Sequence, residues 1–527
     1  MPIAEARWRS ASAMAELFQP LDRVLVGGGD PRLKIDPVRG VNPYGCEALP
    51  CPDTLSFASS TATSISQPAY DRAEDARLSL MRSAIVIGIE AAFDARIEAM
   101  RDELKACLGL TRTGADVVFS PSGTDAQLQA LLLARSLLGP ALTTIILAAD
   151  QTGSGTVCTA RGQHFSAATA NGNSVCKGEP ITGLADSVTS VALPLLDTNG
   201  DFRSDAAADL QVLDAIEQSV AGGTGVVLQI MDSSKLGWRA PSDQCLDEIA
   251  LRWPDQVLVV VDACQMRLGR ARLRKYLDRG YLVIVTGSKF FTGPPFSGAL
   301  LVPAGLATVL DEACEVAPGL CEYSSRSDWP MHWQNLRSGF PVRTNFGQWL
   351  RWEAAIEEIR AYYAVPDAFR RQALTTFANG AQRIIASSPS LQLLPPQRRG
   401  ENDSLDDEEL AQPTIFPFAI RHHGRTFSFE ACRKIHRALS EPGDGVPATA
   451  QGCAPEIAAK VCLIGQPVAL GHRAVLRISA GARLVSETWS PREEVARENL
   501  QRELGHLSAI VAKIEWLLGQ IGDRPLA

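Results

Sequence analysis

"VLVVVDACQMRLGR", residues 257–270, joins an unbroken apolar run to the carboxylate of Asp262, followed by Cys264 and Gln265. A run this apolar is typical of a strand that is buried on both faces. Ligands of parallel sheets bind outside the carboxyl ends of the strands, which is where Asp262 lies. The stretch therefore predicts a buried parallel strand that ends at a binding site.

Six further stretches share this short, apolar, β-rich character, and helix-length segments separate them. They are "DVVFS" (116–120), "TTIILAA" (143–149), "SVALPL" (190–195), "GVVLQIM" (225–231), "YLVIV" (281–285) and "GALLV" (298–302). Strands that alternate with helices favour βαβ units. The sequence thus predicts an α/β fold with a mostly parallel seven-stranded sheet between helices.

The composition of the chain argues against several classes of binding partner and against a membrane segment. The chain has 527 residues, 46% of them hydrophobic, and a net charge of −8 with no basic stripe, which argues against nucleic acid as a partner. No apolar run approaches the roughly 20 residues that span a bilayer, so we expect neither a membrane segment nor a secretory leader, and a cytoplasmic location. The 12 cysteines form no CxxC pairs, so neither a disulfide framework nor a metal site is expected.

Three regions follow from the pattern along the chain. Residues 1–80 form an N-terminal arm and segment, rich in Gly and Pro at first, that contributes to the small domain and the active site. Residues 81–345 form the large domain. Residues 346–527 begin with a bridging helix, 346–364, and continue as a smaller α+β domain with strands at "TIFPFAI" and "RAVLRIS" and a long final helix. The triple glycine at 27–29 is not expected to be a dinucleotide loop, because Pro31 follows and no helix begins there.

Three strand ends carry the groups that pyridoxal phosphate needs. Ser122, Gly123 and Thr124 lead from a strand into a long helix, whose N-terminus suits a phosphate. Asp262 can pair with the pyridine nitrogen, and Lys289, placed after "VIVTGS", can form an imine with the aldehyde. Taken singly, each also has a structural explanation, as a helix cap or a turn residue.

Together these motifs resemble fold type I pyridoxal-phosphate enzymes, and specifically the class V aminotransferase and cysteine desulfurase superfamily. The resemblance runs in collinear order from about residue 54 to about residue 510. The stretches that carry it are "LSFASSTATSISQPAYDRA" (55–73), "SGTDAQ" (122–127), "VDACQ" (261–265), "TGSK" (286–289), "VRTNFGQWLRWEAAIEEI" (342–359) and "LRISAGARL" (476–484).

The resemblance implies a role for each matching residue around the cofactor. Lys289 is the Schiff-base residue, Asp262 contacts the pyridine nitrogen and Gln265 the ring hydroxyl. The phosphate ligands are Gly123, Thr124, Thr286 and Ser288, with Thr344 reaching the phosphate of the neighbouring subunit in a homodimer whose active site lies at the interface. Gln151 takes the place where family members stack a ring on the cofactor. The family's asparagine near the ring hydroxyl falls at Ser233 or Ser234, of which Ser234 is the predicted contact.

The resemblance also implies a substrate site for a small amino acid. Arg477 corresponds to the arginine that holds the substrate α-carboxylate, and Ser60 lies near the substrate. Lys235, together with Trp238 and Arg239, could select an acidic or extended side chain, or could belong to a surface turn. Asn42 and Tyr44 of the N-terminal arm are candidates for closing over the site.

The reaction itself stays open at this level. The amino acid is expected to displace Lys289 as an external aldimine, with Lys289 then acting as general base. Desulfurase-like or other lyase chemistry and transamination are the main interpretations, and decarboxylation or carbon–carbon bond formation is the alternative. A desulfurase would need Cys453 or Cys462 as its nucleophile. An inactive regulator or scaffold of the same fold is the interpretation from a different class.

Overall fold

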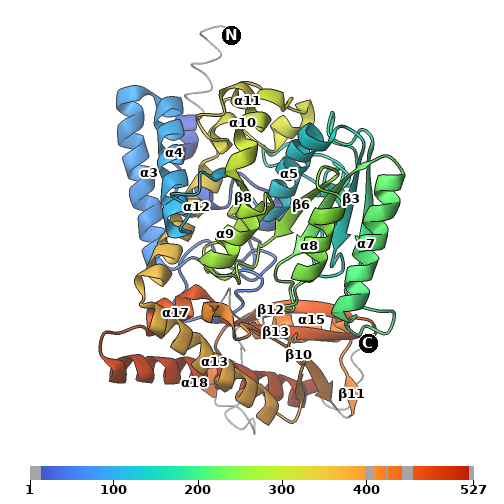
Figure 1. Cartoon of the computed structure of the whole chain (residues 1–527). Helices are drawn as coiled ribbons and strands as arrows, with labels where there is room; N and C mark the ends of the chain where they lie inside the picture. Colours follow the sequence, from blue (N-terminus) through green and yellow to red (C-terminus); the bar gives the residue numbers. More distant parts are fainter. Residues whose placement is uncertain (1–12, 398–407, 423, 442–454, 522–527) are drawn as a thin grey trace.

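The protein has two β-sheets, one above the other, with helices around both (Figure 1). A computed structural model describes residues 13–397, 408–422, 424–441 and 455–521. The upper sheet has seven strands and the lower has six. The predicted α/β class, with a large parallel-sheet region and a smaller α+β region, is confirmed. No described helix is both long enough and apolar enough to cross a membrane.

The seven strands predicted from the sequence form the larger sheet. They are β2 (Asp116–Ser120), β3 (Leu142–Leu147), β4 (Val188–Leu193), β5 (Gly225–Met231), β6 (Val257–Asp262), β7 (Leu282–Thr286) and β8 (Gly298–Val302). Their order is β2-β8-β7-β6-β5-β3-β4. Only β8 runs antiparallel to its neighbours, so the carboxyl ends of the other six strands point to the same edge.

The apolar runs divide between two hydrophobic cores. Val259 and Val261 of β6 face one core, while Leu258 and Val260 face the other. Because successive side chains of a strand point to opposite faces, an unbroken apolar run requires cover on both. One face is covered by helix α5 (Gly123–Leu138), with α10 (Ala304–Ala313), α11 (Gln334–Ser338) and the 3-10 turn η2 (Pro318–Glu322) nearby.

The other face packs against a larger set of helices, which Figure 1 shows to the left of the sheet, in front of it and, for α7, at its right edge. They are α3 (Gln67–Ile87), α4 (Ile89–Cys107), α7 (Asp205–Ala221), α8 (Asp243–Arg252), α9 (Arg270–Asp278) and α12 (Phe346–Ala364). Helix α12 has the bounds predicted for the bridging helix. Shorter elements are α6 (Thr156–Thr159) and the 3-10 turns η3 (Arg326–Asp328) and η4 (Glu408–Leu410).

The lower sheet takes one strand from the N-terminal region. Its strands are β1 (Leu55–Phe57), β9 (Leu391–Leu393), β10 (Ile415–His422), β11 (Arg425–Thr426), β12 (Cys462–Leu470) and β13 (Arg473–Ser479). The helices of this region are α13 (Asp367–Ser387), α15 (Phe429–Leu439), α16 (Pro455–Ala458), α17 (Ala482–Thr488) and α18 (Glu493–Ile521). Strand β1 pairs with β12, so the N-terminal segment is part of the small sheet. The division at residues 80 and 345 remains a proposal.

One buried arginine of α12, Arg351, makes several hydrogen bonds to the N-terminal arm. The arm contains α2 (Leu21–Leu25) and the 3-10 turn η1 (Pro31–Leu33). Arg351 is buried and donates hydrogen bonds to the carbonyl oxygens of Leu25, Gly27 and Gly28 at 2.8, 2.6 and 3.2 Å. The same guanidinium donates to the carbonyl of Phe296 at 2.7 Å, so it ties the arm to the loop that follows β7.

Candidate functional site

A cavity of about 270 Å³ lies at the carboxyl edge of the large sheet. Strand ends of the large sheet, the segment after β1, and β12 and β13 of the small sheet all contribute to its lining. Eleven of the predicted site residues line it: Ser60, Gly123, Thr124, Gln151, Lys235, Asp262, Gln265, Thr286, Ser288, Lys289 and Arg477. The fold thus brings together positions that are more than 400 residues apart in the chain.

The start of helix α5 forms one wall. The Ser122 hydroxyl caps the helix, accepting from the backbone N–H groups of Thr124 and Asp125 at 3.2 and 3.3 Å. A Cβ on Gly123 would lie 2.4 Å from the Cys264 sulfur, so only glycine fits there without a shift. Burial raises the pKa of Asp125 to about 7. Ser122 thus acts as an ordinary helix cap, and this role is compatible with a phosphate bound at the same helix end.

Two hydroxyls from the strand β7 end face the same wall. Thr286 donates its hydroxyl hydrogen to the Cys264 carbonyl at 2.7 Å, and this hydrogen would have to turn into the cavity to reach a phosphate oxygen. The Ser288 side chain is buried and has no hydrogen-bond partner among the described residues. Helix α5 adds its positive N-terminal end. This combination suits a phosphate group, whose oxygens accept hydrogen bonds.

Asp262, the last residue of β6, is a half-buried carboxylate that lines the cavity and has no cationic partner at ion-pair distance among the described residues. One of its oxygens accepts from the Cys264 backbone N–H at 3.1 Å. Burial raises the pKa of Asp262, and the charge of Lys235 lowers it. A buried carboxylate is costly unless a cation or strong donor meets it. A protonated ring nitrogen in the cavity would supply both.

Lys289 follows β7 and is enclosed by protein. Its Nζ donates a hydrogen bond to the carbonyl of Thr61. Burial lowers the pKa of Lys289 to about 8, the nearby Cys264 raises it, and the like charge of Arg477 lowers it further. The lowered pKa leaves about a tenth of the amine neutral at pH 7, far more than for an ordinary lysine, and the neutral form is the one that attacks carbonyl carbons.

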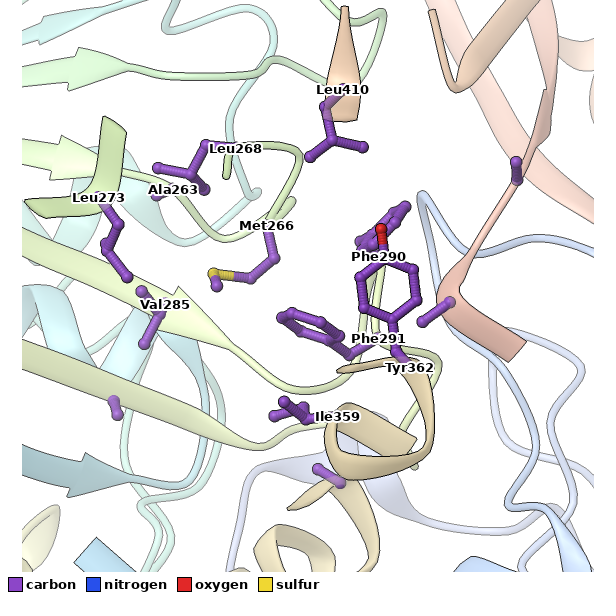
Figure 2. Close-up of a cluster of buried hydrophobic side chains, with 14 of the residues drawn as sticks. Ala263, Met266, Leu268, Leu273, Val285, Phe290, Phe291, Ile359, Tyr362 and Leu410 are labelled. Atoms are coloured by element: carbon purple, nitrogen blue, oxygen red, sulfur yellow. The ribbon is translucent and has the colours of Figure 1, made fainter. Parts of the chain in front are cut away.

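An apolar cluster fixes the loops that carry Gln265 and Lys289. Figure 2 shows Met266, Phe290 and Phe291 from these loops packed with Ile359 and Tyr362 of helix α12. Phe290 and Phe291 each lie edge-on to Tyr362, at ring separations of 5.3 and 5.9 Å. Side chains packed at this density cannot shift independently. The polar residues of the site therefore project from a rigid apolar base.

Arg477 of β13 is a buried cation whose described partners are all neutral. Its guanidinium donates to the Gln466 carbonyl at 3.1 and 3.0 Å, to the Lys235 carbonyl at 3.1 Å and to the Thr61 hydroxyl at 2.9 Å. Burial lowers its pKa to about 9. A guanidinium held in a cavity by carbonyls and a hydroxyl keeps its positive charge for a carboxylate ligand.

A bulge in β12 makes room for Arg477. The pairing of β12 with β13 shifts register between Gly465 and Val468. A Cβ on Gly465 would lie 2.9 Å from the Arg477 Cβ and 2.9 Å from the Ser60 hydroxyl. The bulge places Gln466 in the cavity lining, a residue that the sequence did not identify. The only local signal for Gln466 is "GQPV" itself, because the glycine and proline mark a bulge and bulges are common next to binding sites.

The side-chain amide of Gln265 is hydrogen-bonded within the chain, whereas that of Gln151 is not. The Gln265 amide donates to the carbonyl of Ser60 at 3.0 Å, which ties the segment after β1 to the β6 end. Gln151 is 1% exposed and lines the cavity, yet neither atom of its amide has a partner among the described residues. A buried amide without partners is costly, so its partner is expected to be a bound molecule.

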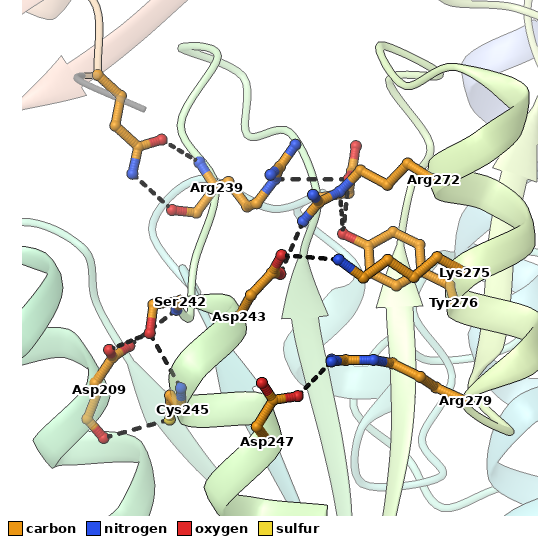
Figure 3. A network of polar contacts seen from close by, with 12 residues as sticks. Asp209, Arg239, Ser242, Asp243, Cys245, Asp247, Arg272, Lys275, Tyr276 and Arg279 are labelled. Carbon is orange, nitrogen blue, oxygen red and sulfur yellow. Dashed lines mark hydrogen bonds and ion pairs between the residues drawn. The ribbon is translucent and has the colours of Figure 1, made fainter. Parts of the chain in front are cut away.

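Only one of the three residues suggested for side-chain recognition reaches the cavity. Lys235 lines it and donates to the Thr152 carbonyl. Trp238 instead stacks on Phe202, with ring centres 3.7 Å apart. Arg239 belongs to the polar network of Figure 3, where Arg272 joins Asp243 of α8 to helix α9, and it lies 3.8 Å from Asp232.

Two predicted contacts lie elsewhere in this chain. The Ser234 hydroxyl accepts from the backbone N–H groups of Leu236 and Trp238, both at 3.1 Å, so it shapes its own turn while Ser233 lines the cavity. Thr344 lines a separate cavity of about 640 Å³, together with Gly28 and Ile89.

Residues of the N-terminal arm complete the lining. Arg32 and Tyr44 border the cavity beside Phe296. Arg32 forms a bidentate pair with Asp30, at 2.9 and 2.5 Å, and its guanidinium lies 4.7 Å from the Phe296 ring centre. Asn42 accepts from the Tyr44 backbone N–H at 2.9 Å and so shapes the arm. No local signal in the sequence points to Arg32, because its contact with the site is tertiary.

Backbone strain is concentrated around the cavity. Five non-glycine residues have positive φ in the described chain, and four lie in loops at the site: Ala148 (59°), Met266 (50°), Thr292 (58°) and Phe296 (69°). Non-glycine residues rarely adopt this conformation, and those that do are frequent at functional sites.

Of the two candidate nucleophilic cysteines, the one in the described chain, Cys462, does not lie at the cavity. Cys462 is buried at the start of β12, pairs with Leu55 and is absent from the lining. Cys453 falls outside the described residues. Cys264 does line the cavity, but burial raises its pKa well above the ordinary thiol value, with the charge of Asp262 adding to the shift. No cluster of metal-ligating side chains occurs within the described ranges.

Comparisons with known proteins give structural relatives only. No family model and no curated protein matches the sequence. Tryptophan decarboxylase of Catharanthus roseus, solved with L-tryptophan, shares 14% identity over 92% of this chain and 87% of its own, with a TM-score of 0.49. A TDC of Oryza sativa, solved with PLP and tryptamine, shares 15% over 86% and 82%, with a TM-score of 0.46.

A third relative, the cystine C–S lyase C-DES with its product cysteine persulfide, shares 13% identity over 86% of this chain and 98% of its own, with a TM-score of 0.48. Because all three scores lie below 0.5, the functional assignment has to rest on the residues of this chain.

Proposed function

We propose that the protein is a pyridoxal 5'-phosphate-dependent enzyme that acts on an amino acid. The observation that supports it most strongly is the pairing of Asp262 and Lys289 in one cavity. Both are half-buried and line the cavity, and neither has an oppositely charged partner at ion-pair distance among the described residues. A pyridinium nitrogen would pair with the Asp262 carboxylate, and an aldehyde would react with the Lys289 amine. Pyridoxal 5'-phosphate carries both groups, so one molecule fits both residues.

The remaining lining residues fit the same molecule. Gly123, Thr124, Thr286 and Ser288 would hold the phosphate at the start of α5, and Gln265 the ring hydroxyl. Gln151, whose amide has no partner in the described chain, would lie over the ring. Ser233 replaces Ser234 as the proposed contact near the ring hydroxyl, because Ser233 lines the cavity.

When bound, the cofactor supplies an aldehyde for the substrate amine and a ring that accepts electrons from the bonds at Cα. Arg477 binds the α-carboxylate bidentately and so orients Cα toward Lys289. With its pKa lowered to about 8, the Lys289 amine is able to take and return the Cα proton near neutral pH. Arg32, Tyr44 and Phe296 limit the access of water from the side of the arm.

For the reaction class, a lyase or aminotransferase is favoured over a cysteine desulfurase. A desulfurase needs a thiolate near the substrate. The one described cysteine at the cavity, Cys264, has a strongly raised pKa, so desulfurase chemistry would depend on Cys453, which falls outside the described residues. Decarboxylation and carbon–carbon bond formation remain the alternative reactions, and an inactive regulator is the non-enzyme alternative.

Assembly and location are proposed on separate grounds. A homodimer with Thr344 reaching the partner's phosphate is supported by the apolar tip of α3, where Ile85, Val86 and Ile87 are 80%, 81% and 56% exposed. Ile89, just beyond this tip, shares the second cavity with Thr344. A reducing compartment such as the cytoplasm is supported by the cysteines, since all those within the described residues are free.

The decisive experiment is covalent capture of the cofactor. Purified apo-protein is mixed with pyridoxal 5'-phosphate, reduced with borohydride and digested, and the modified peptide is identified by mass spectrometry. We expect a single adduct on Lys289, no adduct in Lys289→Ala, and weaker capture in Asp262→Asn. Lys177→Met serves as control, because Lys177 is exposed. An unmodified Lys289 in the wild-type protein would refute the proposed function.

A further inference from the structure

We propose that the substrate carries a second anionic group and that Lys235 binds it. This rests on the proposed function and names the substrate class: an amino acid with an acidic side chain. The argument uses the position of Lys235, the balance of charge in the cavity and the hydrogen-bonding state of the ammonium.

The position of Lys235 relates it to the substrate carboxylate. Its backbone carbonyl accepts from Arg477 Nη1 at 3.1 Å, and its Nζ donates to the Thr152 carbonyl across the cavity lining. Lys235 therefore runs from the Arg477 guanidinium toward the loop after β3. A substrate whose α-carboxylate lies on Arg477 can direct its side chain along the same path.

The charges of the lining leave Lys235 without an assigned partner. The cations that line the cavity are Arg32, Lys235, Lys289 and Arg477, whereas Asp262 is the one carboxylate among the lining residues. Asp30 neutralises Arg32. The proposed function uses Asp262 for the ring nitrogen, Lys289 for the aldehyde and Arg477 for the α-carboxylate.

The ammonium of Lys235 also has unused donors. It has three N–H bonds, and its one hydrogen-bond acceptor in the described chain is the Thr152 carbonyl. Burial lowers the pKa of Lys235 to about 8, Arg477 contributes in the same direction, and the charges of Asp262 and Asp150 oppose the shift without cancelling it. A half-buried ammonium whose one hydrogen-bond acceptor in the described chain is a carbonyl has donors left for a ligand, so an anion at this place would be favoured.

The environment of the ammonium suits an acidic side chain. Thr152, Ser154 and Ser233 line the cavity near the loop that Lys235 reaches, and Gln151 precedes Thr152 with its unpartnered amide. Hydroxyl and amide donors stabilise a carboxylate, sulfinate or phosphate oxygen equally well. An apolar side chain would leave the Gln151 amide and the Ser233 hydroxyl, which have no partner in the described chain, unpaired.

The test compares ligands of matched size on the cofactor-loaded protein by isothermal titration calorimetry. The pairs are L-aspartate with L-asparagine and L-glutamate with L-glutamine. We expect the acidic member of at least one pair to bind about 10- to 100-fold more tightly, as a buried charge-assisted hydrogen bond implies. In Lys235→Met this preference should fall to near unity, whereas Lys235→Arg should keep most of it.

Lys177→Met is the matched control, because Lys177 Nζ also contacts the loop after β3, at 3.5 Å from the Ser154 carbonyl, but from solvent. It should leave the preference unchanged. If Lys235→Met does not fold, Lys235→Gln provides the same comparison with the charge removed and a donor kept.

Three results would overturn the inference. They are equal affinity of the wild-type protein for both members of each pair, an equal loss of both in Lys235→Met, and a loss of cofactor affinity in Lys235→Met, which would place the ammonium on the phosphate. Covalent capture at Lys289, measured first, separates these from failure of the proposed function: capture without an acidic preference refutes the substrate class alone.

Discussion

The Lys289 amine shares its cavity with the cations of Arg477 and Lys235, and this sets its pH behaviour. Because burial and these charges lower the pKa of Lys289 to about 8, the neutral amine is lost only as the pH falls through that value. We predict that the rate of cofactor capture by apo-protein rises with pH and is half-maximal near pH 8, well below the pKa of an ordinary lysine.

The same measurement on Lys235→Met supplies the check. Removing a neighbouring cation stabilises the ammonium form of Lys289, so the midpoint should move to higher pH. Stopped-flow absorbance across pH 6 to 10 follows the reaction. A midpoint that is unaffected by the substitution would show that the two amines do not interact.

Gly465 offers a second prediction, because its missing Cβ leaves room for Arg477 and Ser60. In Gly465→Ala the arginine has to shift, so amino-acid affinity should fall by about 10-fold, the size of a modest overpacking penalty. Cofactor capture at Lys289 should be retained. Gly505→Ala in α18, where an added Cβ meets nothing within 4 Å, is the control. Calorimetric titration with an amino acid measures the difference.

Some residues of the candidate site could be predicted from the sequence and others could not. Asp262 and Lys289 end or closely follow buried apolar runs, where a charged group needs a functional reason. Tyr44 was a candidate from the sequence, whereas Arg32 and Gln466 come to the cavity only through the arm and the β12 bulge, which no local pattern encodes. Ser233 and Ser234 differ by one position in a turn, a distinction that depends on backbone geometry.

At the scale of elements, the seven strands of the large sheet and helix α12 were predictable because their apolar patterns are continuous. Strand β12 was missed. Its "GQPV" segment places a bulge and a proline within the strand, so the regular alternation of apolar and polar side chains is interrupted. Strand β1 is only three residues long and pairs with a partner more than 400 residues away, which short-range patterns do not reveal.

Arg351 is expected to control the N-terminal arm. In Arg351→Met the four carbonyls that it contacts lose charge-assisted hydrogen bonds worth about 1.5–3 kcal/mol each, partly offset by the relief of a buried charge. We predict that limited proteolysis within residues 20–50 accelerates on the order of 100-fold, because the arm opens locally more often.

Arg360→Met on the same helix is the matched control. Arg360 is 57% exposed and its ion pair with Glu357 is long, at 3.9 Å, so its removal should leave cleavage of the arm unchanged. Equal cleavage rates for the wild-type protein and Arg351→Met would show that other contacts hold the arm.

At the scale of the whole molecule, the proposed dimer predicts complementation between subunits. Lys289→Ala cannot form the covalent adduct, and Thr344→Glu should bind the phosphate poorly in the partner's site. Mixed dimers would carry one intact site, formed by Lys289 of one subunit and Thr344 of the other. After unfolding and refolding an equal mixture, we expect about a quarter of wild-type adduct at limiting cofactor, as random pairing in a twofold dimer requires.

Each variant refolded alone is the control and should give little adduct. If Thr344 acted within its own chain, or had no part in cofactor binding, the mixture would give no more adduct than the average of the two variants. Sedimentation of the refolded mixture confirms that dimers have formed.

The left-handed residues Ala148, Met266, Thr292 and Phe296 have a consequence for attempts to make the protein more heat-resistant. Each holds about 1–3 kcal/mol of conformational energy that glycine, and in part asparagine, would release. Selection for thermal tolerance alone would therefore favour exchanges at these four positions. The same exchanges would relax the loops that aim Gln265 and Lys289, so a hardier variant is expected to be a poorer catalyst.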